Sequence, residues 1–287
     1  MDELRPKYFL FENVRGLVTA RGPSGRPGEA LELVINAFEE AGYATRCDLL
    51  NSADYGAPQR RVRLFILGSR LETLPEFPES THAEKGENGL FDKVLPWKTL
   101  GQFLASIPEP YDSEITRPSL ELAQQLKKIP TGSGLKSPGV VETTRPGGHW
   151  GYKQGTFIAD PEKPARTVTA ASTQDWIRLE DGTLRRLTLS ECAGLQGFPH
   201  DWQFIGTRSW RFKQVGNAVP IAFGEAIGKS LAQFALAGPS IDASAKRAVS
   251  AVLPPDFLEY VRYTERDEAR NGQDRPRSSH RPQACER

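Results

Sequence analysis

The sequence predicts an α/β fold in which part of an open sheet is followed by a smaller, irregular region. Three observations predict this fold. Short β-rich runs alternate with an amphipathic helical pattern between residues 8 and 70, as in an open sheet covered by helices. Residues 71–184 are instead rich in Pro, Gly, Thr and Ser. Regular helical patterns then return near residues 187 and 220.

Each element of the first region has its own signal. Residues 8–14, YFLFENV, form a β-rich run that carries a carboxylate, Glu12, near its end. In residues 30–43 apolar side chains recur at helical spacing up to a glycine stop. Two further β-rich runs, residues 44–50 and 62–68, flank the stretch NSADYGAPQRR. The predicted order is therefore strand, helix, strand, loop, strand.

The first of the later helices is marked at its start. Thr188 and Glu191 form the two halves of a capping box, and Leu187 is placed to pack against Cys192 as a hydrophobic staple. These signals predict a helix within residues 187–198.

A second late helix is expected after GNAVP, because Pro220 suits a first helical turn and Gly238-Pro239 would end it. Its apolar stripe comprises Phe223, Ile227, Leu231 and Phe234. Shorter helical pieces are expected around residues 99–107 and 119–129. Beyond Tyr263 the sequence lacks apolar anchors, and we expect it to be disordered.

Composition excludes several classes of protein. With 287 residues and 38% hydrophobic content, the chain can bury a full core. The formal net charge of +1 neither supports nor excludes contact with nucleic acid. The three cysteines, Cys47, Cys192 and Cys285, lack the spacing of a disulfide framework or a zinc site. The first residues are charged and no apolar run reaches about 18 residues, so we expect a cytoplasmic protein with no membrane span and no metal.

Three stretches stand out together: FENV, YGAPQRRVRLFILG, and LTLSECAGLQGFPHDW followed by FKQVGNAVP. In this order and at this spacing they resemble the DNA cytosine-5 methyltransferases of bacterial restriction-modification systems, over residues 5–237. The resemblance implies part of an S-adenosylmethionine-dependent, Rossmann-like methyltransferase sheet with a small, irregular target-recognition domain. It also implies double-stranded DNA as the substrate and S-adenosyl-L-methionine as the methyl donor.

The expected domains follow from this resemblance. Residues 1–70 would be the C-terminal part of the catalytic domain, and residues 71–205 the target-recognition domain. Residues 206–240 would return to the catalytic domain as its last helix. Residues 241–287 would be mostly flexible tail.

The resemblance also implies which residues bind the base. In the family's reaction a thiolate adds to carbon 6 of cytosine, and negative charge develops on the ring. The glutamate of ENV would bond ring nitrogen 3 and the exocyclic amine, which implies Glu12. In the family an arginine contacts the carbonyl oxygen of the base, which implies Arg63 here, and Arg61 would organise the site. Strand alternation would place both arginines on one face. Glu12 could instead be a solvated carboxylate at a strand end. The arginines could form a solvated strand edge or contact phosphates.

Other site residues come from the same resemblance. The asparagine of VGNAVP would help close the cofactor pocket, which implies Asn217, although as a helix-start residue it could equally be an N-cap. DNA contacts are expected where basic and polar side chains mix with aromatic residues and glycines, namely at Arg145, His149, Lys153 and Gln154. This stretch could also be an ordinary polar loop. Arg166, Thr167 and Thr169 could contact phosphates.

Two features of the family are absent from this sequence. No glycine loop precedes FENV, and no Pro-Cys dipeptide supplies a nucleophile. The cysteines are interpreted as core or tail residues. We therefore expect a methyltransferase component that needs a complementary N-terminal subunit and is inactive alone. The alternatives are a catalytically inactive DNA-binding protein and a truncated gene product without function.

Overall fold

The computed structural model describes residues 3–71, 73–88, 93–136, 138–139, 156–237 and 254–272. Its first region is a three-stranded sheet in the order β1-β3-β2. The strands are β1 (Tyr8–Val14), β2 (Ala44–Asn51) and β3 (Val62–Ser69). β3 is antiparallel to both neighbours. With α1 (Glu29–Glu40) between β1 and β2, the expected order of strand, helix, strand, loop, strand is confirmed.

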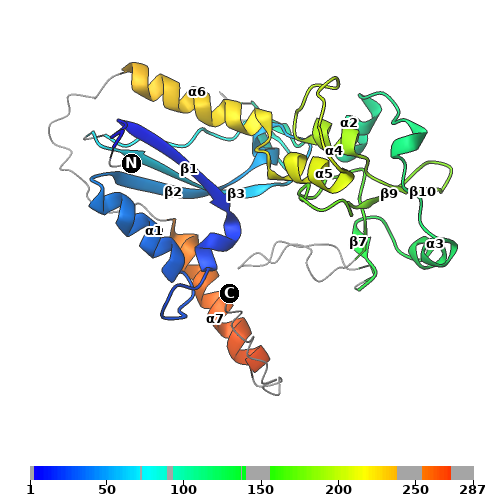
Figure 1. Cartoon of the computed structure of the whole chain (residues 1–287), viewed down its shortest axis with the longest axis horizontal. Helices are drawn as coiled ribbons and strands as arrows, with labels where there is room; N and C mark the ends of the chain where they lie inside the picture. Colours follow the sequence, from blue (N-terminus) through cyan, green and yellow to red (C-terminus); the bar gives the residue numbers. More distant parts are fainter. Residues whose placement is uncertain are drawn as a thin grey trace, which may run out of the picture.

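Helices cover both faces of this sheet. Figure 1 shows α6 (Ile221–Ala237) along one face, and α1 with α7 (Pro255–Gly272) on the other. β3 supplies side chains to both layers, because successive strand residues face opposite sides. Leu64 and Ile66 lie in the core cluster that includes α1, whereas Phe65 packs edge-on against Phe223 of α6.

Aromatic side chains fix β1 to both helical layers. The ring of Phe9 lies 4.4 Å from that of Phe38 in α1, measured between centroids. Tyr8 faces the other way and meets Phe234 of α6 at 5.5 Å. Gly68 stands opposite Phe9 in the register of β1 and β3. A Cβ atom at this glycine would lie 1.9 Å from the Phe9 ring, so the ring needs bare backbone beneath it.

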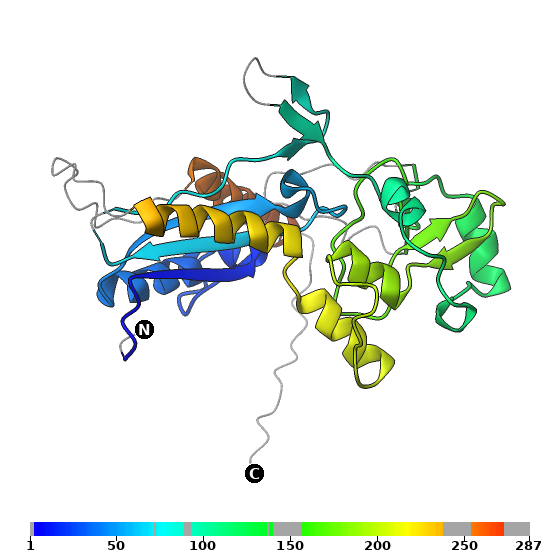
Figure 2. The same ribbon diagram turned by 90° about the horizontal axis from the view of Figure 1, so that it is seen from above.

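The second region lies beside the end of the sheet at which β1 ends and β3 begins (Figures 1 and 2). Its four-stranded sheet has the order β10-β9-β8-β7. These strands are β7 (Ser133–Gly134), β8 (Phe157–Ile158), β9 (Trp176–Arg178) and β10 (Leu184–Arg186). Its helices are α2 (Leu100–Ala105), α3 (Leu120–Lys127), α4 (Leu189–Leu195) and α5 (Arg208–Asn217). The two short helices expected around residues 99–107 and 119–129 are confirmed as α2 and α3.

Smaller elements connect these parts. A projecting arm, visible in Figure 2, holds a three-stranded sheet of order β4-β6-β5. Its strands are β4 (His82–Ala83), β5 (Glu87–Asn88) and β6 (Lys93–Pro96). The 3-10 helices are η1 (Arg15–Thr19), η2 (Ser52–Tyr55) and η3 (Asp112–Glu114). The expected loop between β2 and β3 therefore contains one 3-10 turn, η2.

The capping box expected before α4 is confirmed. Thr188 Oγ1 accepts a hydrogen bond from Glu191 N at 3.2 Å, and Glu191 Oε2 accepts one from Thr188 N at 2.8 Å. Glu191 also makes a buried bidentate ion pair with Arg185 of β10, at 2.7 and 2.8 Å. Leu187 and Cys192 lie in the same core cluster, as the predicted staple requires.

Two expectations from the sequence are wrong. Disorder was expected beyond Tyr263, but α7 continues as far as Gly272. This helix is anchored by Phe257, which is only 4% exposed within the core cluster of the sheet. Asn217 does not begin a helix, because it is the last residue of α5 and Ala218 is already extended. Within residues 241–287, the structure thus describes one helix, α7.

Candidate active site

A carboxylate and a guanidinium meet where β1 ends and β3 begins. Glu12 is opposite Phe65 and Val14 is opposite Arg63, so Glu12 and Arg63 are diagonal neighbours on one face. Glu12 Oε1 lies 3.2 Å from Arg63 Nε. The Glu12 side chain is 31% exposed and that of Arg63 13%. The pair is thus held by strand register and remains partly open to solvent.

The surroundings of Arg63 restrain its guanidinium. Its Nη1 donates a 2.9 Å hydrogen bond to the main-chain oxygen of Val62. Burial lowers the pKa of Arg63, and the charge of Glu12 opposes that shift. An arginine pKa begins so high that the group stays protonated at neutral pH. The candidate site therefore contains a fixed cation next to a carboxylate.

Arg61 occupies a different environment from Arg63. It precedes β3, is only 2% exposed, and donates from Nη1 to the oxygen of Val168 at 2.9 Å and from Nη2 to the oxygen of Gly216 at 2.7 Å. Burial lowers its pKa to about 9, with the charge of Arg63 adding to the shift. Its guanidinium is therefore engaged with main chain.

Arg61 thus links the start of β3 to the second region, and we call this buried contact the junction. Two glutamines complete it. Gln59 Nε2 donates to the oxygen of Leu195 at 2.9 Å and to Gln196 Oε1 at 2.8 Å, while Gln59 Oε1 accepts from Val168 N at 3.2 Å. Gln196 Nε2 in turn donates to the oxygen of Val215 at 2.8 Å. Both glutamines are fully buried. Sequence reasoning missed them, although each stands inside a quoted motif, QRR or LQGFP.

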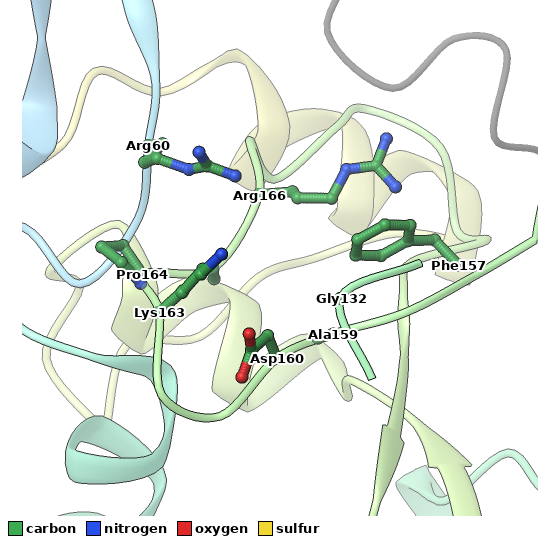
Figure 3. A pocket seen from close by; sticks show the side chains of 9 residues that line it. Arg60, Gly132, Phe157, Ala159, Asp160, Lys163, Pro164 and Arg166 are labelled. Atoms are coloured by element: carbon green, nitrogen blue, oxygen red, sulfur yellow. The ribbon is translucent and has the colours of Figure 1, made fainter. Parts of the chain in front are cut away.

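Main-chain pairing extends the junction toward β8. Gln59 and Ala165 form a parallel bridge, in which Arg60 N donates to the oxygen of Ala165 at 2.8 Å. Thr167 Oγ1 donates to the oxygen of Arg60 at 2.8 Å, so this hydroxyl holds the loop in place. Arg166 projects from the same stretch, with its guanidinium 4.2 Å from the centre of the Phe157 ring (Figure 3).

A comparison with known families assigns this arrangement. The family model described as C-5 cytosine-specific DNA methylase matches residues 1–233. The chain belongs to this family. The match includes both quoted glutamine motifs and the Glu12–Arg63 pair, and it ends before α7.

Relatives of this methylase-family chain agree with the match. Type II methyltransferase M.NgoFVII of Neisseria gonorrhoeae is 34% identical over 224 residues, which cover 75% of this chain and 56% of the relative. Type II methyltransferase M.SacI of Streptomyces achromogenes is 28% identical over 250 residues, covering 80% of this chain and 60% of that protein. The chain therefore spans little more than half the length of these curated relatives.

Solved structures support the fold assignment. Dnmt2 methyltransferase of S. pombe superimposes with a TM-score of 0.52 at 17% identity, covering 80% of this chain and 67% of that chain. At this identity the likeness concerns the fold alone. The expected α/β methyltransferase fold is confirmed.

The described cysteines of this methylase-family chain are poor nucleophiles. Cys47 is 2% exposed in β2, and burial raises the pKa of its thiol to about 12. Cys192 is fully buried in α4, and burial raises its pKa as well. Only a thiolate attacks carbon efficiently, so burial disfavours nucleophilic attack by either thiol. Cys285 lies outside the described residues.

Methyltransferases of this kind generally use S-adenosylmethionine, and such a donor needs a concave site that covers most of its surface. Asn217 is exposed at the end of α5. The pocket beside Arg60 and the pocket along α3 do not include it.

The remaining expected site residues divide into two groups. Arg145, His149, Lys153 and Gln154 lie outside the described residues. Thr169 is exposed and its oxygen accepts from Gln174 Nε2 at 3.0 Å. Within the described ranges, no three His, Cys, Asp or Glu side chains gather as a metal site would require. No described helix has both the length and the apolar surface that a bilayer crossing demands.

Proposed function

We propose that this chain is a component of a DNA cytosine-5 methyltransferase of the restriction-modification type. Within that enzyme it supplies the clamp for an extruded cytosine and the target-recognition region, and a complementary N-terminal portion supplies the nucleophile and most of the methyl-donor site. The observation that carries the proposal is the partly exposed Glu12–Arg63 pair, held at 3.2 Å by adjacent strands of a methylase-family fold. Acting on bacterial DNA, such an enzyme would work in the cytoplasm.

The chemistry of the pair fits this role. When a thiolate adds to carbon 6 of cytosine, electron density moves toward ring nitrogen 3 and the carbonyl oxygen. A proton held by Glu12 would stabilise charge at nitrogen 3, and the guanidinium of Arg63 would stabilise the oxygen. The buried hydrogen bonds of Arg61 and Gln59 would hold the start of β3 while the base enters. Arg61 is thus proposed as a positioning residue.

S-adenosylmethionine would supply the methyl group. In this chain Asn217 is the proposed contact, at the end of α5 next to the Gly216 oxygen that Arg61 binds. Because α5 ends there and α6 begins at Ile221, the intervening turn could border a donor held mainly by the complementary portion.

A second candidate is a protein that binds DNA without modifying it. This candidate needs no nucleophile at all, which agrees with the raised thiol pKa values of Cys47 and Cys192. The two candidates differ in one measurable respect, which is methyl transfer after complementation.

The test is a methyl-transfer assay with labelled S-adenosylmethionine and duplex DNA. The purified chain is assayed alone and together with a polypeptide that carries a methylase glycine loop and Pro-Cys loop. We expect transfer only from the pair. Transfer by the chain alone would overturn the need for a complementary portion. DNA binding without transfer by the pair would instead favour the binding protein.

A further inference from the structure

Three basic side chains converge on one small pocket at the junction of the two regions. Arg60 comes from the loop before β3, and Lys163 and Arg166 come from the loop after β8. The pocket is small, with a cavity volume of about 20 Å³. Figure 3 shows the charged ends of Arg60 and Lys163 directed into it, with Arg166 above the ring of Phe157.

The convergence is imposed by main chain. The parallel bridge between Gln59 and Ala165 places Arg60 next to Arg166, and Ala165 N also donates to the oxygen of Pro58 at 3.0 Å. Like charges held opposite each other across paired strands are destabilising. These backbone bonds therefore hold the main chain of Arg60 and Arg166 side by side.

The acidic groups nearby offset only part of this charge. Asp160 is the one carboxylate among the residues that line the pocket. Its Oδ1 accepts from Glu162 N at 3.1 Å, which directs that oxygen to its own loop. Asp175 lies outside the lining and pairs with Arg166 at 3.4 Å. Counted with Asp175, three cations face two carboxylates, which leaves this part of the junction net positive and suited to an anion.

The shape of the pocket selects among anions. The guanidinium of Arg166 lies over the Phe157 ring, and a guanidinium can make the paired hydrogen bonds that oxyanions accept. The other lining residues are small or apolar: Gly132, Ala159, Pro164 and Ala165. They offer no set of donors and acceptors that would read a base edge. The lining therefore fits one phosphoryl group better than a whole nucleotide.

We infer that this pocket binds one backbone phosphodiester of duplex DNA, through Arg60, Lys163 and Arg166. The inference rests on the proposed function and extends it to two residues, Arg60 and Lys163, and to a defined position at the junction. The contact is independent of sequence, and it places the DNA strand against the loop that leads into Arg63. In this way a backbone contact would fix the register of DNA relative to the base clamp.

The test is the salt dependence of DNA binding by the purified chain. Fluorescence anisotropy with a labelled duplex of about 20 base pairs is measured between about 50 and 200 mM salt. The double variant Arg60→Gln/Lys163→Gln should lower the slope of log affinity against log salt by about 0.9, the value for one phosphate. Its affinity at 0.1 M salt should fall on the order of tenfold, equally for all duplex sequences.

Two matched variants control for general charge loss and misfolding. Lys229→Gln removes the same charge from α6, where Lys229 is 71% exposed and paired with Glu225, and should keep the wild-type slope. Lys163→Arg keeps the charge and should keep the slope as well. An unchanged slope in the double variant, or an equal fall in Lys229→Gln, overturns the inference. A chain that binds no duplex at any salt concentration overturns it too.

Free phosphate is distinguished by a second measurement. The thermal shift caused by inorganic phosphate is compared with that of chloride at equal ionic strength. A phosphate shift lost in Lys163→Gln, with an unchanged DNA slope, would assign the pocket to a free anion and reject the phosphodiester. Methyl transfer by the complemented pair is measured separately. If the double variant keeps the wild-type salt slope while the complemented pair transfers methyl groups normally, this inference is wrong and the proposed function stands.

Discussion

Arg61 Nη2 donates a 2.7 Å hydrogen bond to the main-chain oxygen of Gly216, 155 residues further along the chain. The bond joins the start of β3 to the last turn of α5. Gly216 itself lies against the main chain of residues 169 and 170, where an added Cβ would stand 2.3 Å from Thr169 C. One glycine and one buried arginine thus bring three distant segments together beside the Glu12–Arg63 pair.

We predict that Gly216→Ala destabilises the chain by about 1 to 3 kcal/mol or more, because the new methyl group meets backbone that has no rotamer to change. The matched control is Gly224→Ala in α6, where an added Cβ meets nothing within 4 Å. That variant should gain about 0.5 to 1 kcal/mol from helix propensity. Urea unfolding of both variants checks the prediction, and equal stabilities would refute the close approach at Gly216.

The buried ion pair between Arg185 and Glu191 gives a second prediction. Glu191→Gln keeps a residue that can complete the capping box but leaves Arg185 buried without a counter-charge. Breaking such a pair from one side typically costs about 3 to 5 kcal/mol. Glu225→Gln removes an exposed partner of Lys229 and should cost far less, since exposed ion pairs contribute little to stability. Thermal unfolding measures both variants. If Glu191→Gln lost no more stability than Glu225→Gln, burial would not be what makes the first ion pair important.

Local chemistry in the sequence predicted the elements whose signals lie within one turn or one strand. The capping box of Thr188 and Glu191 is one case, because both partners are three residues apart and the box is complete within the helix start. The β-rich run of residues 62–68, which forms β3, is another. Both depend on interactions between near neighbours, and such interactions can be recognised in a single sequence.

The junction could not be predicted in the same way. The bond between Gln59 and Gln196 spans 137 residues, and Arg61 binds main-chain oxygens that any residue type could present. Nothing in the local sequence indicates such partners. Alternation along an assumed strand placed Arg61 beside Arg63, but β3 begins only at Val62. The helix α7 was not predicted because its apolar side chains, among them Phe257, are few within a polar segment.

The base clamp is tested by Glu12→Gln in the complemented enzyme. Glutamine can still hydrogen-bond but cannot deliver a proton to ring nitrogen 3. Loss of such a stabiliser typically costs roughly 3 to 4 kcal/mol, or about two to three powers of ten in rate. Single-turnover methylation and DNA affinity are measured in parallel, with Glu32→Gln on the exposed face of α1 as the control. An unaltered rate in Glu12→Gln would leave Glu12 as a strand-end carboxylate.

The cysteines give a prediction about pH. The raised pKa of Cys47, about 12, means that the folded thiol stays protonated while an unfolded thiol ionises near pH 8.5. Alkylation of Cys47 at that pH should therefore be slower than in urea by about three powers of ten, and alkylation of Cys192 should also be slower than in urea. The same difference makes stability fall as the pH rises above about 8.5. Mass spectrometry of each peptide measures the labelling, and rapid native labelling of either cysteine would contradict their burial.

The last prediction concerns an exchange of the proposed recognition region, residues 71–184. Its replacement by the corresponding segment of a relative with another target should change the sequence that the complemented enzyme methylates. The chemistry should survive, because Glu12, Arg61, Arg63 and Asn217 all lie outside the exchanged segment. The junction should survive too. Arg61 and Gln59 bind the main-chain oxygen and nitrogen of Val168, and any residue at that position has these atoms.

The physical basis of this exchange is a division of labour between the two regions. Base-edge contacts specify the site, each worth on the order of 1 to 3 kcal/mol of discrimination, whereas the clamp meets only the extruded cytosine, whose edges are the same at every site. A map of methylation sensitivity across treated DNA reports which sequence is modified. The parental chain in the same complemented enzyme is the control for activity. If the chimera methylates the original site, the readers lie outside residues 71–184, and the proposed domain boundary is wrong.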